Sequence, residues 1–307
     1  MDDRVHQGPG PELTSDVPLA VTSAAASAPV HDPARLAAIA KRRRRNTAVS
    51  TVSTVVVLGV LAVVIVTSPG WPAVKESFFD VDYAREVLPD IVAGLRLTVL
   101  LFVTAEPVIL IVGLLLAVVR GLTSPIFTPL RILSIAYADV VRGIPTILLI
   151  LMFGFGMPAL NLQGMPDSPL FWAWFALVVS YSAYVAEVLR AGLESVHPSQ
   201  RAAARALGLN QYQSLRYVVV PQAVRRVTPP LLNDFIALQK DTALVAIIGA
   251  GIEMTRAAQI RAFTDFNYTP FVVAACFYIL LTVPLSRWAD WMAQRQRRRS
   301  QAGGGAL

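Results

Sequence analysis

Charged side chains interrupt the apolar segments of this chain at places where a hydrocarbon environment makes them costly. They are Glu106, Asp139, Arg142, Glu187, Lys240 and Asp241, with Thr242 beside the last two. A charged group near the bilayer centre costs about 2.5 to 3.5 kcal/mol on insertion scales, so each needs a partner or a water-lined cavity. Such groups can bind the carboxylate or amino group of a solute, or can form an ion-coupled path.

Arg142 lies in the run Tyr137-Ala-Asp-Val-Val-Arg-Gly-Ile-Pro145. The proline that ends this run cannot donate to the carbonyl of Val141, and Gly143 permits close approach or unwinding, so we expect loosened backbone beside Arg142. Asp139 lies three residues back on the same helical face and is one expected partner. The alternative is that Arg142 binds a substrate carboxylate.

The other intramembrane groups have similar alternatives. Glu187 precedes Arg190 by three residues, so the two are expected to pair, unless Glu187 binds an amino group or a cationic side chain. Pro107 follows Glu106 and predicts a local helix break with a carboxylate at membrane depth. We expect an interior structural role for this glutamate, with direct transport as the alternative.

A polar stripe runs along the segment 231–249. Its residues repeat at i, i+7, which places Asn233 with Lys240 and Asp234 with Asp241, so the stripe must face protein or water. Lys240, Asp241 and Thr242 therefore either line a solute pathway or pair internally.

A polar, arginine-bearing island at 199–221 separates two apolar segments and predicts two short helices outside lipid. Ser199 is expected to cap the first helix, Gly208 to follow its end, and Asn210 to cap the second. One face of the second helix can be buried while the Gly208 elbow faces outward. We expect this island to dock into the groove of a partner.

Composition places the chain among polytopic membrane proteins. Of its 307 residues, 55% are hydrophobic and 15% charged, too apolar for an ordinary soluble domain. The single cysteine, Cys276, excludes an intrachain disulfide and a multi-cysteine metal site. The net charge of +7 comes from basic residues beside apolar segments, where they set orientation, so we expect no nucleic-acid binding.

The predicted organisation is all-α with six spans. The expected parts are a disordered basic cytoplasmic tail at 1–46, an N-terminal transmembrane helix at 47–67, an extracytoplasmic segment at 68–90, a core at 91–293 and a cytoplasmic tail at 294–307. Within the core, the spans are expected at about 91–119, 132–157, 170–190, 231–249 and 270–291. Segments assigned to the inside hold eighteen Lys and Arg against four outside, which predicts that both termini are cytoplasmic.

The run Ala203-Ala204-x3-Gly208-x9-Val218-x-Val220-Pro221 resembles the cytoplasmic coupling loop of permease subunits of bacterial ABC importers, although Ala202 stands where the family has an acidic residue. The Arg-Gly-Ile-Pro run at 142–145 is similar to that of the polar amino-acid subfamily. Lys240-Asp-Thr-Ala-Leu244 also resembles a family element, with Ala243 in place of serine. The resemblance covers about residues 87–293.

This resemblance implies a type I ABC importer permease fold with one extra N-terminal transmembrane helix. The implied ATPase-coupling residues are Gln200, Ala203, Ala204, Arg205, Gly208, Leu209 and Pro221. The expected substrate pathway is formed by Arg142, Glu187, Lys240, Asp241, Thr242 and Asp139.

The same resemblance implies the partners of this chain in the cell membrane. The protein partners are a dimer of ATP-binding subunits that holds ATP and Mg, a second permease that is identical or paralogous, and an extracytoplasmic substrate-binding protein. The expected substrate is an amino acid with a polar or charged side chain. The chain has no Gly-x4-Gly-Lys-Ser/Thr phosphate loop and no nucleophile-base constellation, so we expect neither an enzyme nor a cofactor of its own. The alternative is an ion-coupled secondary carrier or channel that acts without an ATPase.

Overall fold

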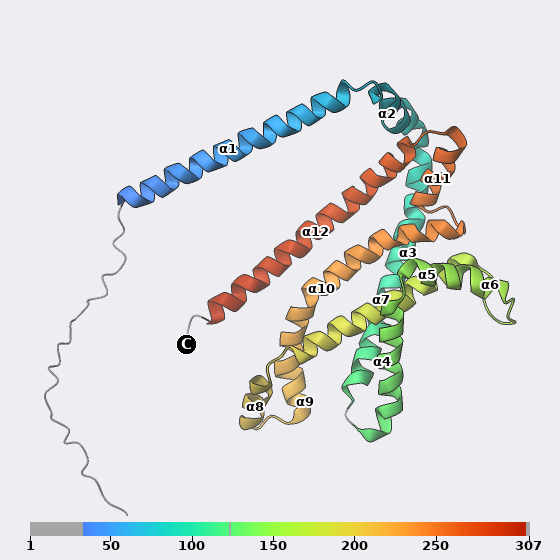
Figure 1. Ribbon diagram of the computed structural model, residues 1–307. Coiled ribbons are helices and arrows are strands. Elements are labelled where there is room, and N and C mark those ends of the chain that lie inside the picture. Colours follow the sequence, from blue (N-terminus) through green and yellow to red (C-terminus); the bar gives the residue numbers. More distant parts are fainter. Residues whose placement is uncertain (1–32, 123, 305–307) are drawn as a thin grey trace, which may run out of the picture. The chain divides into compact units, whose positions relative to one another are not determined.

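The computed structural model describes residues 33–122 and 124–304, and the side chains of residues 41–122 and 124–295 (Figure 1). Every regular element in these ranges is helical, which confirms the predicted all-α class. The chain divides into two compact units, Met1–Ser68 and Pro69–Leu307.

The first unit contains one long helix, α1, at Pro33–Val66. The expected disordered tail at 1–46 is wrong for residues 33–46, because the helix begins fourteen residues before the apolar stretch. Ala-rich and Arg-rich sequence has high helix propensity, so the apolar helix extends backward through it. Residues 1–32 lie outside the described residues. The part of α1 from Lys41 to Val66 is long and apolar enough to cross a membrane.

The second unit begins with α2 at Trp71–Phe78 and α3 at Val81–Gly121. The Asp80 carboxylate caps α3 by accepting from the N–H groups of Asp82 and Tyr83. The expected extracytoplasmic segment at 68–90 is thus mostly helical, and α3 already includes its last ten residues.

The predicted break at Pro107 is wrong, because α3 continues through it. The buried face of the helix repeats every three or four residues on both sides of the proline, through Leu101, Ala105, Ile109, Gly113 and Ala117. Packing of this face against α7 keeps one helical register across the missing hydrogen bond.

The expected span at 132–157 consists of two helices. After the short η1 at Pro125–Phe127, α4 covers Thr128–Gly143 and α5 covers Thr146–Leu151. The helical stretches Pro125–Gly143 and Thr146–Ala159 meet at 101°. The carbonyl of Val141 does not lose its partner as expected, because it accepts from the Ile144 N–H at 3.2 Å. The second stretch continues through the π-helical η2, Met152–Gly156, and α6, Met157–Ala159.

Helix α7, Pro169–Glu194, is the central element of the second unit. It packs against α3, α4, α5 and α10, and Figure 1 shows it crossing between them. Close approach to α3 depends on Gly113, since a Cβ there would lie 2.5 Å from the Val185 side chain. Small residues at such contacts are typical of helices that pack in a membrane.

Short helices follow α7 and lead into the last long ones. The order is α8 at Pro198–Ala206, α9 at Gln211–Ser214, the π-helical η3 at Leu215–Val219, α10 at Val220–Asp241, the 3₁₀-helical η4 at Thr242–Ile248, α11 at Met254–Asp265 and α12 at Thr269–Gly304. Within the described residues, four helices are long and apolar enough to cross a membrane, or five if the bent pair counts as one span. The segment 231–249 is not among them, because its polar residues lower its hydropathy.

Candidate functional site

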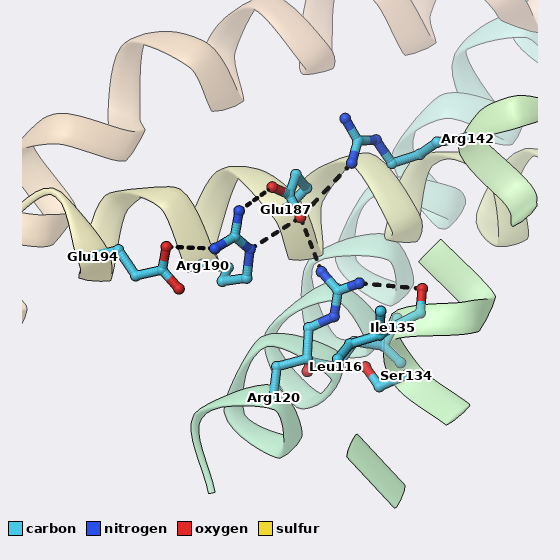
Figure 2. A network of polar contacts seen from close by, with 8 residues as sticks. All are labelled: Leu116, Arg120, Ser134, Ile135, Arg142, Glu187, Arg190 and Glu194. Atoms are coloured by element: carbon cyan, nitrogen blue, oxygen red, sulfur yellow. Dashed lines mark hydrogen bonds and ion pairs between the residues drawn. The ribbon is translucent and has the colours of Figure 1, made fainter. Parts of the chain in front are cut away.

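Glu187 is the centre of a group of five charged residues, which we call the Glu187 cluster: Arg120, Arg142, Glu187, Arg190 and Glu194 (Figure 2). The Oε2 atom of Glu187 accepts from Arg120 Nη1 at 2.9 Å and from Arg190 Nε at 3.1 Å. Arg142 Nη1 lies 3.7 Å from the same oxygen. Arg190 also pairs with Glu194, one turn further along α7. The predicted pair of Glu187 and Arg190 is confirmed.

The cluster joins three helices. Arg120 comes from the end of α3, Arg142 from the end of α4, and the other members from α7. The side chain of Arg120 is only 5% exposed, and its Nη2 donates to the carbonyl of Ile135 at 3.3 Å. Because this guanidinium contacts both α4 and Glu187, it fixes where the glutamate carboxylate lies.

Arg142 is held more loosely than the other two arginines. Its side chain is 37% exposed, and its guanidinium carbon lies 5.8 Å from the centre of the Tyr184 ring. The predicted pair with Asp139 is wrong. Asp139 is exposed, and within the described residues no ion pair joins the two. Both are on α4, and Arg142 contacts α7 instead.

The three predicted pathway residues near the end of α10 have different environments. Lys240 is exposed, whereas Asp241 accepts from the Tyr181 hydroxyl on α7 at 2.9 Å. Thr242 is fully buried and donates to the carbonyl of Gln239 at 2.8 Å, at the residue where the α-helix becomes 3₁₀. Within the described residues, no hydrogen bond joins this group to the Glu187 cluster.

The 199–221 island forms the expected elbow between α8 and α9. Gly208 has a φ of +81°, and its N–H donates to the carbonyl of Arg205 while that of Leu209 donates to Ala204, a Schellman arrangement. Asn210 and Gln213 form a capping box at the start of α9. The predicted position of Gly208 after the end of the first helix and the predicted N-cap at Asn210 are confirmed.

The predicted N-cap of the first helix is wrong, because His197 caps α8 and not Ser199. The Nδ1 atom of His197 accepts from the Ser199 N–H at 3.2 Å. Pro198 occupies the first helical position, which its fixed φ suits, so the helix begins two residues earlier than expected.

One side of the island is attached to the end of α7. Val196, Val219 and Ala223 form a small buried cluster there, and Ala204 is also buried. Polar contacts reinforce it, because Arg201 donates to the carbonyl of Leu193 at 3.1 Å and Gln222 donates to Gln200 at 3.3 Å. These contacts join the island to the end of α7 and the start of α10.

The other side of the island is free. Ala203, Arg205, Gly208 and Pro221 are exposed, and a Cβ on Gly208 would meet nothing within 4 Å. Leu207 and Tyr212, which the sequence analysis did not single out, are 82% and 65% exposed on either side of the elbow. Large apolar side chains presented to solvent in this way indicate a contact surface.

Sequence reasoning also did not single out Glu253, which is fully buried before α11. It caps that helix by accepting from the N–H groups of Thr255 and Arg256, and Thr98 donates to it at 3.3 Å. Burial raises the pKa of Glu253, while these hydrogen bonds act in the opposite direction. Its position indicates a structural role in holding α11 against α3.

Several helices long and apolar enough to cross a membrane, together with an exposed pair of short helices between them, are typical of the membrane subunit of a transporter. Residues 109–298 match the family described as the inner membrane component of binding-protein-dependent transport systems, and the chain belongs to this family. It is a pore subunit of an ABC importer, a multi-pass protein of the plasma membrane and not an enzyme. This membership argues against a carrier that acts alone.

Several relatives cover most of this region. The chain is 34% identical to the probable glutamine ABC transporter permease GlnM of Bacillus subtilis, over 60% of this chain and 83% of the relative. It is 33% identical to the arginine transport permease ArtQ of the same organism, over 65% and 89%. It is 32% identical to the glutamate/aspartate import permease GltK of Escherichia coli O6:H1, over 68% and 94%.

A solved structure described as an amino acid ABC transporter with histidines is also similar. Its TM-score to this chain is 0.64 at 31% sequence identity, over 70% of this chain and 98% of that one. An inward-facing methionine transporter, MetNI, has a TM-score of 0.55 at 20% identity and supports the fold alone.

Proposed function

We propose that this chain imports an amino acid, with polar and charged amino acids as the first to test. Relatives named for glutamine, arginine and glutamate/aspartate support this substrate class. The exposed guanidinium of Arg142 beside the 101° bend also supports it, since Arg is suited to bidentate recognition of a carboxylate. Lys240 and Asp241 are proposed to line the same pathway, with the buried Thr242 behind them, and Asp139 to face it.

A dimer of ATP-binding subunits, which would hold ATP and Mg, is the proposed energy source. Its docking surface would be the free side of the island, formed by Gln200, Ala203, Arg205, Gly208, Leu209 and Pro221 and extended by Leu207 and Tyr212. Ala204, also expected to take part in coupling, is buried and would support this surface from the attached side. ATP-driven closure of that dimer would move the island and, through the contacts of Arg201 and Val219 with the end of α7, the helix that carries Glu187. The pore would thereby change between inward-facing and outward-facing states.

The complete transporter is proposed to contain a second permease subunit, identical or paralogous, and an extracytoplasmic binding protein that delivers the substrate. Six spans with both termini in the cytoplasm are proposed for this chain. The excess of Lys and Arg in segments assigned to the inside supports that orientation. For the segment 231–249, packing of α10 against α7 and α12 supports a span that protein shields from lipid.

The observation that carries this proposal is the exposed elbow at Gly208 in a chain whose sequence has no Gly-x4-Gly-Lys-Ser/Thr phosphate loop. The test is uptake of radiolabelled L-glutamine, L-arginine and L-glutamate by proteoliposomes that contain this chain, its ATPase subunit and the binding protein. We expect uptake that requires ATP and the ATPase subunit and that persists when a protonophore collapses ion gradients. Uptake driven by a proton or sodium gradient without ATP would contradict the proposal.

A further inference from the structure

The Glu187 cluster contains one more positive than negative charge. Three guanidinium groups, from Arg120, Arg142 and Arg190, face the two carboxylates of Glu187 and Glu194. The cluster also has more hydrogen-bond donors than acceptors, because the buried Nε–H of Arg120 has no acceptor within the described part of the chain. A cluster with surplus donors and surplus positive charge is suited to accept one more carboxylate.

Arg142 is the member that can accept it. Arg120 is buried and donates to Glu187 at 2.9 Å, and Arg190 holds both glutamates. Arg142 approaches Glu187 only to 3.7 Å and, within the described residues, donates no hydrogen bond. Loss of the contact between Arg142 and Glu187 would leave the glutamate with two arginine partners, so this contact is the easiest to exchange.

We infer that Glu187 is a resident competitor for the substrate carboxylate at Arg142. In the empty transporter, Glu187 holds Arg142 against α7. When an amino acid enters, its carboxylate takes the guanidinium of Arg142 and Glu187 stays with Arg120 and Arg190. This inference rests on the proposed function, and it assigns Arg142 as the substrate ligand and Arg120 as the residue that positions the competitor.

The exchange has a directional consequence for affinity. Each substrate molecule must displace Glu187 from Arg142, so the contact weakens substrate binding. Removing the glutamate carboxylate should therefore tighten binding, by about two- to five-fold for one partly exposed ion pair. A purely structural cluster predicts the opposite, since its disruption would leave affinity unchanged or reduced.

The test measures equilibrium binding to the purified complex of this chain with its ATPase subunit, without binding protein. The probes are radiolabelled L-glutamine, L-arginine and L-glutamate, with the α-amide of each as an unlabelled competitor. The variants are Glu187→Gln and Glu187→Asp, and the second keeps the charge that buried Arg120 needs while it shortens the reach toward Arg142. Glu194→Gln is the matched control, because it removes one carboxylate of the same cluster that contacts Arg190 and not Arg142. Thermal denaturation in detergent identifies the variants that fold.

We expect Glu187→Gln or Glu187→Asp to lower the Kd of the amino acid that binds, with Glu194→Gln unchanged. The inhibition constant of the α-amide of L-glutamine or L-arginine should not change, because that amide has no carboxylate, and the α-amide of L-glutamate, which keeps its side-chain carboxylate, is compared separately. An unchanged or raised Kd in a folded Glu187 variant, an equal effect of Glu194→Gln, or an equal gain for the amide would overturn the inference. Absence of binding by the wild-type complex would overturn it too, while ATP-dependent uptake by the same protein would leave the proposed function standing.

Discussion

Arg142 illustrates how far a single residue can be interpreted from sequence. Its charge inside an apolar segment and the proline three residues later predict a special position, and the bend that follows agrees with this. Its partner was predicted by spacing along one helix, which gave Asp139. The contact in fact comes from Glu187, 45 residues further along the chain. Spacing rules apply within a helix and carry no information on which helix packs against it.

Replacement of Arg142 tests its role in transport. Arg142→Ala is expected to abolish amino-acid uptake and substrate-stimulated ATPase activity, because the guanidinium that would bind the carboxylate is lost. Arg142→Lys should retain part of the activity, since it keeps the charge but not the bidentate geometry. Thermal stability should change little in both, as the side chain is 37% exposed. Wild-type uptake by Arg142→Ala would show that the residue serves packing only.

Gly94 is a residue whose constraint becomes visible only in the fold. A Cβ at this position would lie 2.8 Å from the backbone N and Cα of Met254, so α3 and the start of α11 would have to separate. We expect Gly94→Ala to lower the free energy of unfolding by about 1 to 3 kcal/mol. The measurement is thermal denaturation in detergent. Gly121→Ala is the control on the same helix, because its Cβ would meet nothing within 4 Å, and equal effects of both substitutions would contradict the packing argument.

At the scale of elements, caps and turns were predicted more accurately than breaks. Gly208 and Asn210 act as their residue types suggest, because the contacts that define a cap lie within a few residues. The two prolines behave differently. Pro107 lies inside a continuous helix, whereas Pro145 follows a bend. We attribute the continuity at Pro107 to the packing of α3 on α7, which the sequence alone does not reveal.

The elbow between α8 and α9 can be tested by a substitution at Gly208. Gly208→Leu should leave ATPase activity but reduce uptake at least several-fold, because a side chain at a φ of +81° costs about 1 to 2 kcal/mol and protrudes where the ATPase subunit is proposed to dock. The measurement is the ratio of substrate transported to ATP hydrolysed in proteoliposomes.

Gly164→Leu is the matched control for this substitution. Gly164 has a φ of +83° and also has open space around its Cβ, but it lies in the loop between α6 and α7 and not in the island. The control should retain normal coupling. If both variants transported the same amount of substrate per ATP hydrolysed, the proposal that the ATPase subunit docks at the Gly208 elbow would be contradicted.

At the scale of the whole molecule, composition and apolar spacing predicted the class and the all-α fold, and the resemblance of the runs at 142–145 and 203–221 predicted the family. They predicted the number of spans less securely, because the segment 231–249 is polar and divides between α10 and η4. The Glu187 cluster could not be predicted as a unit from the sequence, because its three arginines come from three different helices. Contacts between residues close in sequence can be predicted from the sequence, whereas a cluster of residues from different helices depends on how those helices pack.

The proposed topology predicts which face each loop presents. In a Cys276→Ser background, Gly208→Cys should react with a membrane-impermeant thiol reagent only from the cytoplasmic side, and Gly164→Cys only from the outside. The measurement is labelling of intact cells compared with inverted vesicles. Labelling of both positions from the same side would contradict the single membrane crossing proposed between them. Labelling of Gly208→Cys from the outside would contradict the proposed docking of the ATPase subunit.

The π-helical turn at Leu215–Val219 has a mechanical consequence for the way this subunit is driven. A π turn holds one residue more than an α turn, so if the same five residues wound as ordinary α-helix, everything before them would be rotated by about 100° around the axis of α10. The spans would keep their sequence and packing, but α8 and α9 would project from the end of α10 in a different direction. The π turn at Leu215–Val219 thus sets the direction in which the first part of the island projects from α10.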